Sequence, residues 1–441
     1  MRTQIDRPER PALRLRCEDS ATRIARMIGV SASPFLANPS EYCAVPLNAI
    51  TASWPLLLGM GVLMLGAGLQ STLLGVRATL EGFATPVIGI VMSMYYVGYL
   101  LGTTAAPRLL AKVGHVRVFA ALAAVASAAN LFQAAFVAPL SWGGMRLLSG
   151  LSFAGIYVVA ESWLNAQATR ATRGRLFAVY MVVLYFGLGA AQFLLVLSNP
   201  RTAGPFMLVS ALISLALVPI ALSDQPTPAV LVPQRVRLAD LYHDSPFGVV
   251  GVAAAGVISS ILFSIGPVYA RLRGLDTTGV ATYMGASIFG AVAAQYPIGA
   301  LADRLDRRAV IAGVCVVATA VATTLAVFND LPHVLFVSLA AVFSALVLTI
   351  YPLAVSHVND RLEPAQIVQA SSTLLLLNGS AAILGPTLAT SVISVYGPAA
   401  YFAVLATITG ALALYGLWRK IRRQPVPSSH KAPFVKAQPQ C

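Results

Sequence analysis

Long apolar stretches separated by short polar loops occupy most of the chain between residues 50 and 418. Each stretch is close to the roughly 20 residues that a helix needs to cross the hydrocarbon core of a bilayer. Twelve are found, at approximately 53–75, 86–106, 116–138, 141–162, 175–198, 203–222, 247–270, 278–301, 309–328, 333–355, 366–392 and 396–418. Because lipid offers no hydrogen-bond partners to open backbone, the pattern predicts an all-α membrane protein with twelve transmembrane helices.

Three polar segments divide this pattern. Residues 223–246 form the one long polar segment inside the apolar region, and they separate six stretches from six. We therefore expect an N-terminal six-helix bundle over 51–222, a cytoplasmic linker over 223–246 and a C-terminal six-helix bundle over 247–418. Residues 1–50 contain no long apolar run and are expected to be a disordered cytosolic tail rather than a signal peptide. Residues 419–441 are expected to be a basic cytosolic tail.

The basic residues are distributed unevenly between the two sides of the predicted bundle. Of the 30 Lys and Arg residues, 25 lie in the two tails and in the loops that follow even-numbered stretches. Four lie in the opposite loops, and Arg146 lies inside the fourth stretch. The positive-inside rule therefore predicts that both termini are cytoplasmic. The basic residues are spread over many short loops, where they can attract anionic lipid headgroups. The net charge of +14 therefore does not require a nucleic-acid partner.

Composition excludes several other classes of protein. The chain is 57% apolar and 10% charged, whereas a soluble domain carries about 25% charged residues. The four cysteines are scattered without metal-ligand or disulfide spacing, at Cys17, Cys43, Cys315 and Cys441. The sequence contains no phosphate-binding glycine loop that ends in Lys-Ser or Lys-Thr. We therefore expect no metal, no cofactor and no enzymatic activity.

Two sequence similarities suggest that the chain is a duplicated six-helix unit. Residues 156–165 and 350–359 share Ile, Tyr, Ala, Ser and Asn at matching positions, at an offset of 194. The loop at 107–118 matches the loop that contains Asp303 at an offset of 192, with Ala111 in place of the acid. We therefore expect two pseudo-symmetric six-helix bundles, and transporters built in this way bind substrate between their halves near the middle of the membrane.

A dense group of charges follows the eighth stretch, in the sequence QYPIGALADRLDRR at 295–308. One interpretation is a cytoplasmic loop whose charge orients the neighbouring helices. The order of residues resembles the motif G-x-L-A-D-R-x-G-R-R of the major facilitator superfamily, with Asp306 in place of the second glycine. The resemblance implies an ion-pair network between helices that move. Its expected members, with the matching N-terminal loop, are Asp303, Arg304, Arg307, Arg308, Lys112 and Arg117.

Three charged residues are candidates for coupling transport to protons. Arg146 begins a sequence that resembles the fourth-helix motif R-x-x-x-G-x-x-x-A of this superfamily, and the resemblance implies a role in proton handling. The alternative is an arginine that extends to water at the membrane face. Glu161 ends the fourth stretch, where an ion pair with nearby arginines is the simpler interpretation. Glu81 lies four residues after Arg77, so the two can pair on one helical face or lie in a solvated loop.

Polar side chains inside the stretches are candidates for lining a substrate cavity. An amide in lipid either joins two helices or faces a cavity, and the sequence leaves both possibilities open. Aromatic packing is likewise an alternative for each tyrosine. The candidates are Gln70, Gln133, Tyr157, Tyr185, Gln192, Gln295 and Asn378.

Several longer strings are similar to a narrower group, the YcaD-like bacterial inner-membrane transporters. They include GLQSTLLGVRATLEGF at 68–83, AGIYVVAESWLN at 154–165 and RGRLFAVYMVV at 173–183. The similarity extends from about residue 50 to 418 and implies no particular substrate. The fifth stretch lacks the proline of the antiporter motif G-x-x-x-G-P-x-x-G-G, which argues against a drug–proton antiporter.

These observations predict a monomeric secondary active transporter of the bacterial inner membrane. It would move a small solute by alternating access, coupled to protons as a symporter or an antiporter. Efflux of amphipathic compounds competes with import of a small polar solute. Many aromatic residues in the cavity would favour efflux, whereas amides and charges would favour import. A transporter-shaped receptor or scaffold is the alternative from another class, and a membrane enzyme acting on lipid would need a nucleophile or metal site that the sequence does not display.

Overall fold

The computed structural model describes residues 53–168, 172–222, 236–328 and 330–422. The expected N-terminal tail, the first part of the expected linker and most of the expected C-terminal tail lie outside these residues. Within them, twelve helical segments are long and apolar enough to cross a membrane. The twelve predicted spans are therefore confirmed, although their ends differ by several residues. The first helix, for example, continues to Leu80 rather than residue 75.

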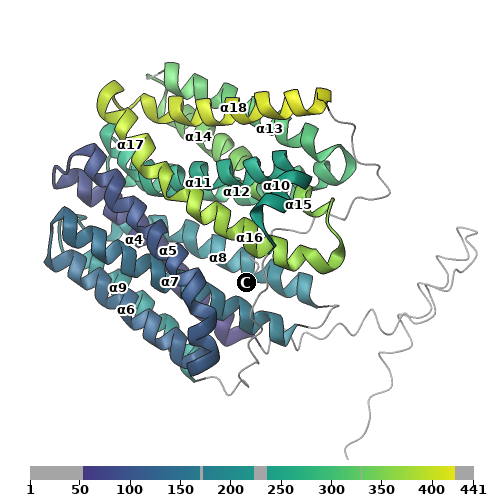
Figure 1. Ribbon diagram of the computed structural model, residues 1–441. Coiled ribbons are helices and arrows are strands. Elements are labelled where there is room, and N and C mark those ends of the chain that lie inside the picture. The colour runs from purple at the N-terminus through teal and green to yellow at the C-terminus, as the bar shows by residue number, and fades with distance from the viewer. Residues whose placement is uncertain (1–52, 169–171, 223–235, 329, 423–441) are drawn as a thin grey trace, which may run out of the picture. The chain divides into compact units, whose positions relative to one another are not determined.

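The N-terminal bundle contains the first six spans. Its helices are α4 (Trp54–Leu80), α5 (Thr85–Val113), α6 (His115–Ala135), α7 (Pro139–Gln167), α8 (Arg173–Leu194) with the short 3₁₀ helix η2 (Leu195–Leu197), and α9 (Gly204–Ala221). Figure 1 shows these helices together, in purple to teal. We call the end of the bundles that holds residues 81–84 the outer end, and the end that holds Gly114 the inner end.

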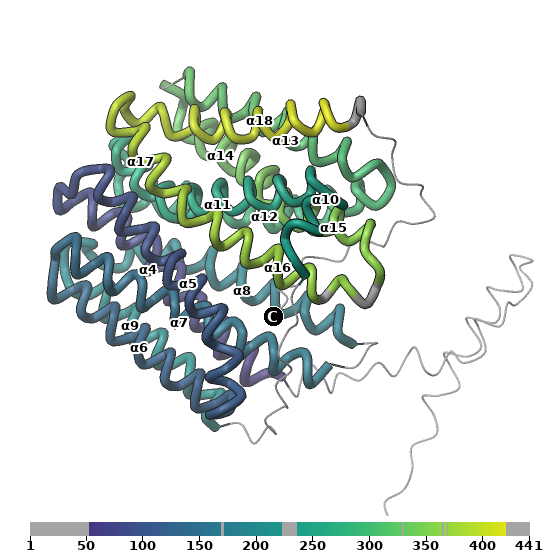
Figure 2. Tube along the Cα trace, viewed as in Figure 1, coloured from purple at the N-terminus to yellow at the C-terminus, as the bar shows by residue number. Residues whose placement is uncertain are grey.

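The C-terminal bundle contains the other six spans, preceded by a short helix. Its elements are α10 (Leu238–Asp244), α11 (Pro246–Leu272), α12 (Thr277–Arg304), α13 (Arg307–Val327), α14 (His333–Val347), α15 (Ile350–Asn359), α16 (Pro364–Ala382), α17 (Leu384–Tyr396) and α18 (Ala400–Arg422). In Figure 2 the tube of this bundle runs from green to yellow, beside the purple and blue tube of the N-terminal bundle.

Two spans of the C-terminal bundle are interrupted, and prolines explain both breaks. The ring of a proline inside a helix clashes with the carbonyl group four residues earlier. Pro352 lies four residues after Leu348, where the helix breaks between α14 and α15. Pro386 lies four residues after Ala382, the last residue of α16. The membrane tolerates such breaks because neighbouring helices can satisfy the freed backbone groups.

The second part of the expected linker belongs to the C-terminal bundle. Leu241 of α10 is fully buried in a cluster with apolar side chains of α11, α15 and α16. The hydroxyl group of Thr373 donates to the carbonyl oxygen of Val236 at 2.8 Å. Arg361 donates to the carbonyl oxygen of Asp244. Residues 236–245 are therefore fixed to the C-terminal half by one buried leucine and two hydrogen bonds.

Glycines allow α5 and α7 to cross with their backbones in contact. A Cβ atom at Gly150 would overlap the carbonyl oxygen of Tyr95, and one at Gly98 would overlap that of Leu147. A Cβ atom at Gly102 would overlap the carbonyl oxygen of Leu151. Small residues in this arrangement are typical of helix pairs in lipid, where close packing drives association. Gly150 is the glycine of the R-x-x-x-G motif, so the motif fixes this crossing.

The two bundles meet closely near their outer ends. Figure 1 shows α5 beside α17, and a Cβ atom at Gly89 of α5 would overlap the side chain of Thr390 in α17. One turn further along both helices, the hydroxyl groups of Ser93 and Thr387 are 2.9 Å apart. On α4, Gly75 lies against Pro267 of α11. Uncharged groups therefore form these contacts between the bundles.

We predict that Gly150→Ala destabilises the protein and that Gly144→Ala does not. The added methyl group at position 150 would force α5 and α7 apart, and overpacking of this kind costs about 1–3 kcal/mol. Gly144 lies on the same helix with no atom near its Cβ position. Alanine there should be neutral or slightly stabilising, because glycine weakens a helix interior by roughly 0.5–1 kcal/mol. Thermal unfolding of both purified variants measures the difference, and equal melting temperatures would contradict the role of the crossing.

Candidate functional site

A cavity of about 410 Å³ lies between the two bundles. Its N-terminal wall comes from α4, α5, α7 and α8, and its C-terminal wall from α11, α12, α15 and α16, with one residue of α14. Of the candidates from the sequence, Gln70, Tyr157, Tyr185, Gln192, Gln295, Asn378, Arg146 and Glu161 line it. The volume lies within the range of about 300–1,000 Å³ that is usual for small-molecule sites.

Aromatic rings cover much of the cavity wall. The lining includes Tyr95, Tyr96, Tyr99, Phe153, Tyr157, Tyr185, Phe263 and Tyr351. The ring centroids of Tyr95 and Tyr99 are 6.3 Å apart, and those of Tyr99 and Tyr157 are 6.4 Å apart. These contacts form a continuous row along α5 and α7. The sequence analysis missed the α5 tyrosines, although their spacing of four residues places Tyr95 and Tyr99 on one helical face.

Arg146 faces this cavity and not lipid. Its side chain is 2% exposed, and its guanidinium carbon lies 4.4 Å from the centre of the Tyr95 ring. The Nε atom is buried without a hydrogen-bond partner. The position follows from the glycine crossing, because Gly150 brings α7 against the backbone of Tyr95 one turn away from Arg146. This geometry excludes the alternative in which Arg146 extends to water at the membrane face.

Gln133 lies behind the cavity wall, contrary to the expectation that it lines the cavity. The Nε2 atom of Gln70 donates to Oε1 of Gln133 and to the hydroxyl oxygen of Ser149, both at 3.3 Å. Trp142 donates its indole N–H to the carbonyl oxygen of Gln133 at 2.9 Å. Gln70 therefore separates Gln133 from the cavity, and Gln133 supports the position of Gln70.

Gln192 and Asn378 each join two helices of one bundle. Gln192 accepts a hydrogen bond of 2.5 Å from the hydroxyl group of Thr72 on α4, and it donates to the carbonyl oxygen of Leu188 at 3.0 Å. Asn378 donates to the carbonyl oxygen of Val252 on α11 at 3.1 Å. Each amide thus ties its helix to the first span of its own bundle.

Gln295 of α12 and Tyr185 of α8 line the cavity from opposite bundles, and their side chains lie close enough to interact.

Glu161 is the sole carboxylate among the described residues that line the cavity. It is 4% exposed and lies close enough to Tyr157 and Tyr351 to interact with both electrostatically. Glu81 does not line the cavity, because it pairs with Arg77 at 2.7 Å at the outer end of α4. The predicted pairing of these two residues is present. In the described part of the chain, no group of three or more His, Cys, Asp or Glu side chains is placed to hold a metal ion.

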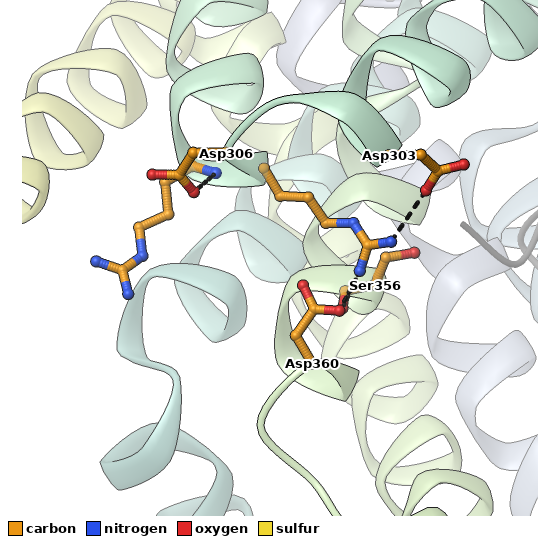
Figure 3. Close-up of polar contacts among 6 residues, drawn as sticks. Asp303, Asp306, Ser356 and Asp360 are labelled. Atoms are coloured by element: carbon orange, nitrogen blue, oxygen red, sulfur yellow. Dashed lines mark hydrogen bonds and ion pairs between the residues drawn. The ribbon is translucent and has the colours of Figure 1, made fainter. Parts of the chain in front are cut away.

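Arg307 forms the centre of an ion-pair network at the inner end of the C-terminal bundle. Its side chain is 2% exposed and contacts the carboxylate of Asp303 at 3.1 Å and that of Asp360. It also donates to the carbonyl oxygen of Ser356 at 3.2 Å. Figure 3 shows Asp303, Ser356 and Asp360 around this guanidinium group. We call these four residues the Arg307 network. It joins α12, α13 and the end of α15.

Two aspartates, Asp360 and Asp306, have roles that the loop motif alone did not predict. The sequence analysis did not identify Asp360, because its partner lies 53 residues earlier and no local pattern marks the pair. Asp306, which replaces the second glycine of the motif, accepts a hydrogen bond from the backbone N–H of Arg308 at 3.1 Å (Figure 3). It therefore caps the first turn of α13, a role that a short acidic side chain fills well.

Two of the six expected network residues, Asp303 and Arg307, belong to the Arg307 network, whereas the buried side chain of Arg308 is not among the four residues that define it. Lys112, Arg117 and Arg304 are exposed, and none belongs to the ion pairs around Arg307. In the N-terminal bundle, His115 occupies the position 192 residues before Arg307. Its Nε2 atom lies 3.1 Å from the hydroxyl group of Ser162, the counterpart of Ser356. The charged network of one half thus corresponds to a contact between imidazole and hydroxyl in the other.

Comparison with known proteins places this architecture in a family. The model of the Major Facilitator Superfamily matches residues 56–293 and 276–439. An uncharacterized MFS-type transporter of Enterobacter sp. (strain 638), Ent638_1421, is 28% identical over 355 residues, which are 79% of this chain and 91% of that protein. The uncharacterized MFS-type transporter YcaD of Escherichia fergusonii is 27% identical over 358 residues, 79% of this chain and 91% of that protein.

Solved structures share the fold at much lower sequence identity. The nucleoside transporter NupG is 15% identical, with a TM-score of 0.71 over 85% of this chain and 100% of that chain. A bacterial homolog of the human lysosomal transporter Spinster, in an inward-facing and unoccupied conformation, is 13% identical. Its TM-score is 0.64 over 88% of this chain and 98% of that chain. With twelve spans, a cavity between two six-helix bundles and a family model that matches most of its length, the chain belongs to the major facilitator superfamily of membrane transporters.

Proposed function

We propose that the protein is a secondary active transporter that moves a small organic solute across the bacterial plasma membrane by alternating access. The observation that carries this proposal is the cavity of about 410 Å³, whose walls come from both bundles. A site shared between two halves changes its access when the halves rock against each other. A transporter-shaped receptor or scaffold has no need for a cavity divided in this way.

The contacts between the bundles support an inward-facing state. Hydrogen bonds between the bundles near the outer end join Ser71 to the carbonyl oxygen of Phe263 at 3.1 Å and Ser93 to Thr387 at 2.9 Å. The distribution of basic residues supports a cytoplasmic position for the inner end. In this state the solute would exchange with the cytoplasm, and separation of the outer contacts would give access from the other side.

Glu161 is the best candidate for the proton site. It lies in the cavity, whereas Glu81 is paired with Arg77 at the outer end. A carboxylate that binds a proton more tightly in one conformation shifts the equilibrium toward that conformation. The cavity wall combines the aromatic residues expected for efflux of amphipathic compounds with the amides and charges expected for import of polar solutes.

The Arg307 network is proposed to hold α12, α13 and α15 together while the bundles move. The ion pairs of Arg307 with Asp303 and Asp360 lie within the C-terminal bundle. These two contacts therefore stiffen that half.

Alternating access predicts that a cysteine in the cavity reacts with an impermeant maleimide from both sides of the membrane. Ser259→Cys, in a background with the four native cysteines replaced by serine, provides this reporter. We expect labelling in inside-out and in right-side-out vesicles. A disulfide between Ser93→Cys and Thr387→Cys should abolish labelling from the outside and preserve it from the cytoplasmic side.

The matched control for this experiment carries the reporter with Ser93→Cys alone. It should be labelled from both sides under the same oxidising conditions. Outside labelling that persists with the disulfide formed, or that never occurs in the reporter protein, would refute alternation through these contacts.

Proton coupling predicts that the outward-facing fraction depends on pH through Glu161. The ratio of outside to inside labelling of Ser259→Cys should differ between acidic and alkaline buffer. Glu161→Gln should remove this difference, because the amide cannot titrate. Glu81→Gln is the control and should retain it, since Glu81 does not line the cavity. A pH response that survives Glu161→Gln would exclude this residue as the proton site.

The Arg307 network predicts unequal effects of its two acids on stability. The side chain of Asp360 is 5% exposed, whereas that of Asp303 is 39% exposed. Loss of one partner from a buried ion pair costs about 3–5 kcal/mol, whereas an exposed pair contributes about 0–1 kcal/mol. Asp360→Asn should therefore lower the melting temperature of the purified protein much more than Asp303→Asn. Equal losses would show that burial does not distinguish the two pairs.

A further inference from the structure

The cavity wall contains a cation that lacks a carboxylate partner. Arg146 is the one basic side chain among the described residues that line it, and Glu161 is the one acidic side chain. The two lie 15 positions apart on α7, which corresponds to about 22 Å along a helix axis. Glu161 therefore cannot neutralise Arg146 at close range. The ion pairs of the described residues do not include Arg146.

The groups around Arg146 stabilise its charge only in part. A cation over a tyrosine ring gains a modest stabilisation, and the centre of the Tyr95 ring lies 4.4 Å from the guanidinium carbon. Burial of an unpaired charge costs more than such a contact gains. The Nε atom has no hydrogen-bond partner, and none of the side-chain hydrogen bonds of the described residues involves the guanidinium group. A buried guanidinium group whose charge is stabilised only in part can bind an anion as its partner.

The surroundings define what kind of molecule carries that anion. Tyr95, Tyr96, Phe153 and Phe263 line the same cavity as Arg146. The hydroxyl group of Tyr96 is already engaged with Ser264 at 3.1 Å, so its ring remains available for contact. Aromatic faces pack against flat or apolar groups. The body of the ligand is therefore apolar, and its charged group is small enough to reach the guanidinium.

We propose that the cavity binds an organic monocarboxylate with an aromatic or similarly apolar body, and that Arg146 holds the carboxylate group. The inference rests on the proposed transport function, because it assigns the substrate class of the same cavity. An arginine fork matches the two oxygens of a carboxylate and forms strong, charge-assisted hydrogen bonds. One cation balances one negative charge, which favours a carboxylate over a doubly charged phosphate group.

This role for Arg146 differs from proton transfer. A guanidinium group keeps its proton at every pH that a protein tolerates, so it cannot relay a proton itself. It can hold an anion whose binding compensates its charge. The solute and the titrating carboxylate then occupy different parts of the cavity, with Arg146 toward the outer end of α7 and Glu161 toward the inner end.

Binding of simple probes to the purified full-length protein tests the assignment. Isothermal titration calorimetry in detergent would compare benzoate and 2-naphthoate with their neutral amides, with benzylamine and with phenyl phosphate. We expect at least one carboxylate to bind tenfold or more tightly than its amide and than benzylamine. Phenyl phosphate should bind more weakly than the best carboxylate.

Variants identify the residue that holds the anion. Arg146→Gln should reduce carboxylate affinity at least tenfold. Arg273→Gln is a matched control, since Arg273 also lies over an aromatic ring, 4.9 Å from that of Phe336, but does not line the cavity. It should bind like the unmodified protein. If Arg146→Gln does not fold, Gln70→Glu serves instead, because it adds a competing carboxylate opposite Ser149, one turn from Arg146.

Each remaining outcome counts against the proposal. Equal affinity for carboxylates and amides, no carboxylate binding, or full carboxylate affinity in Arg146→Gln or in Gln70→Glu would overturn it. Tighter binding of phenyl phosphate would overturn the choice of a monocarboxylate. Binding is measured without transport, so failure of the vesicle labelling experiment with intact carboxylate binding would reject alternating access and leave the anion site in place.

Discussion

Close approach of helices in lipid is the constraint on which this structure depends. Lipid tails are as apolar as leucine, so helices associate through tight packing and hydrogen bonds rather than through burial of apolar surface. Gly98, Gly102 and Gly150 bring the backbones of α5 and α7 into contact. That contact places Arg146 over Tyr95 and turns the tyrosines of α5 toward the same cavity. The geometry of the site is thus a result of the crossing.

The polar groups of the membrane region fall into two kinds. Gln192 and Asn378 use their amides to join neighbouring helices, and Gln70 is supported by Gln133. Arg146 differs, because packing leaves its charge without a hydrogen-bonded partner. An unpaired charge at a cavity wall is costly, so Arg146 indicates where stability has been given up for binding.

The sequence predicts the spans well because the length of an apolar run is a local property. The six-plus-six division and the pairing of Arg77 with Glu81 follow equally from short-range patterns. Which amide faces the cavity depends on helix rotation, so the sequence could not separate Gln70 from Gln133. Asp360 was missed for a related reason, since only folding brings it to Arg307.

The uncharged nature of the outer contacts has a consequence for how the protein responds to its medium. Dissolved salt screens interactions between charges and has little effect on bonds between hydroxyl groups. The pairs Ser93–Thr387 and Tyr96–Ser264 are of the second kind, and the ion pairs of Arg307 with Asp303 and Asp360 lie within one bundle. Ionic strength therefore has little influence on how firmly the outer ends are held together. The outer contacts stay closed at low and at high salt concentration.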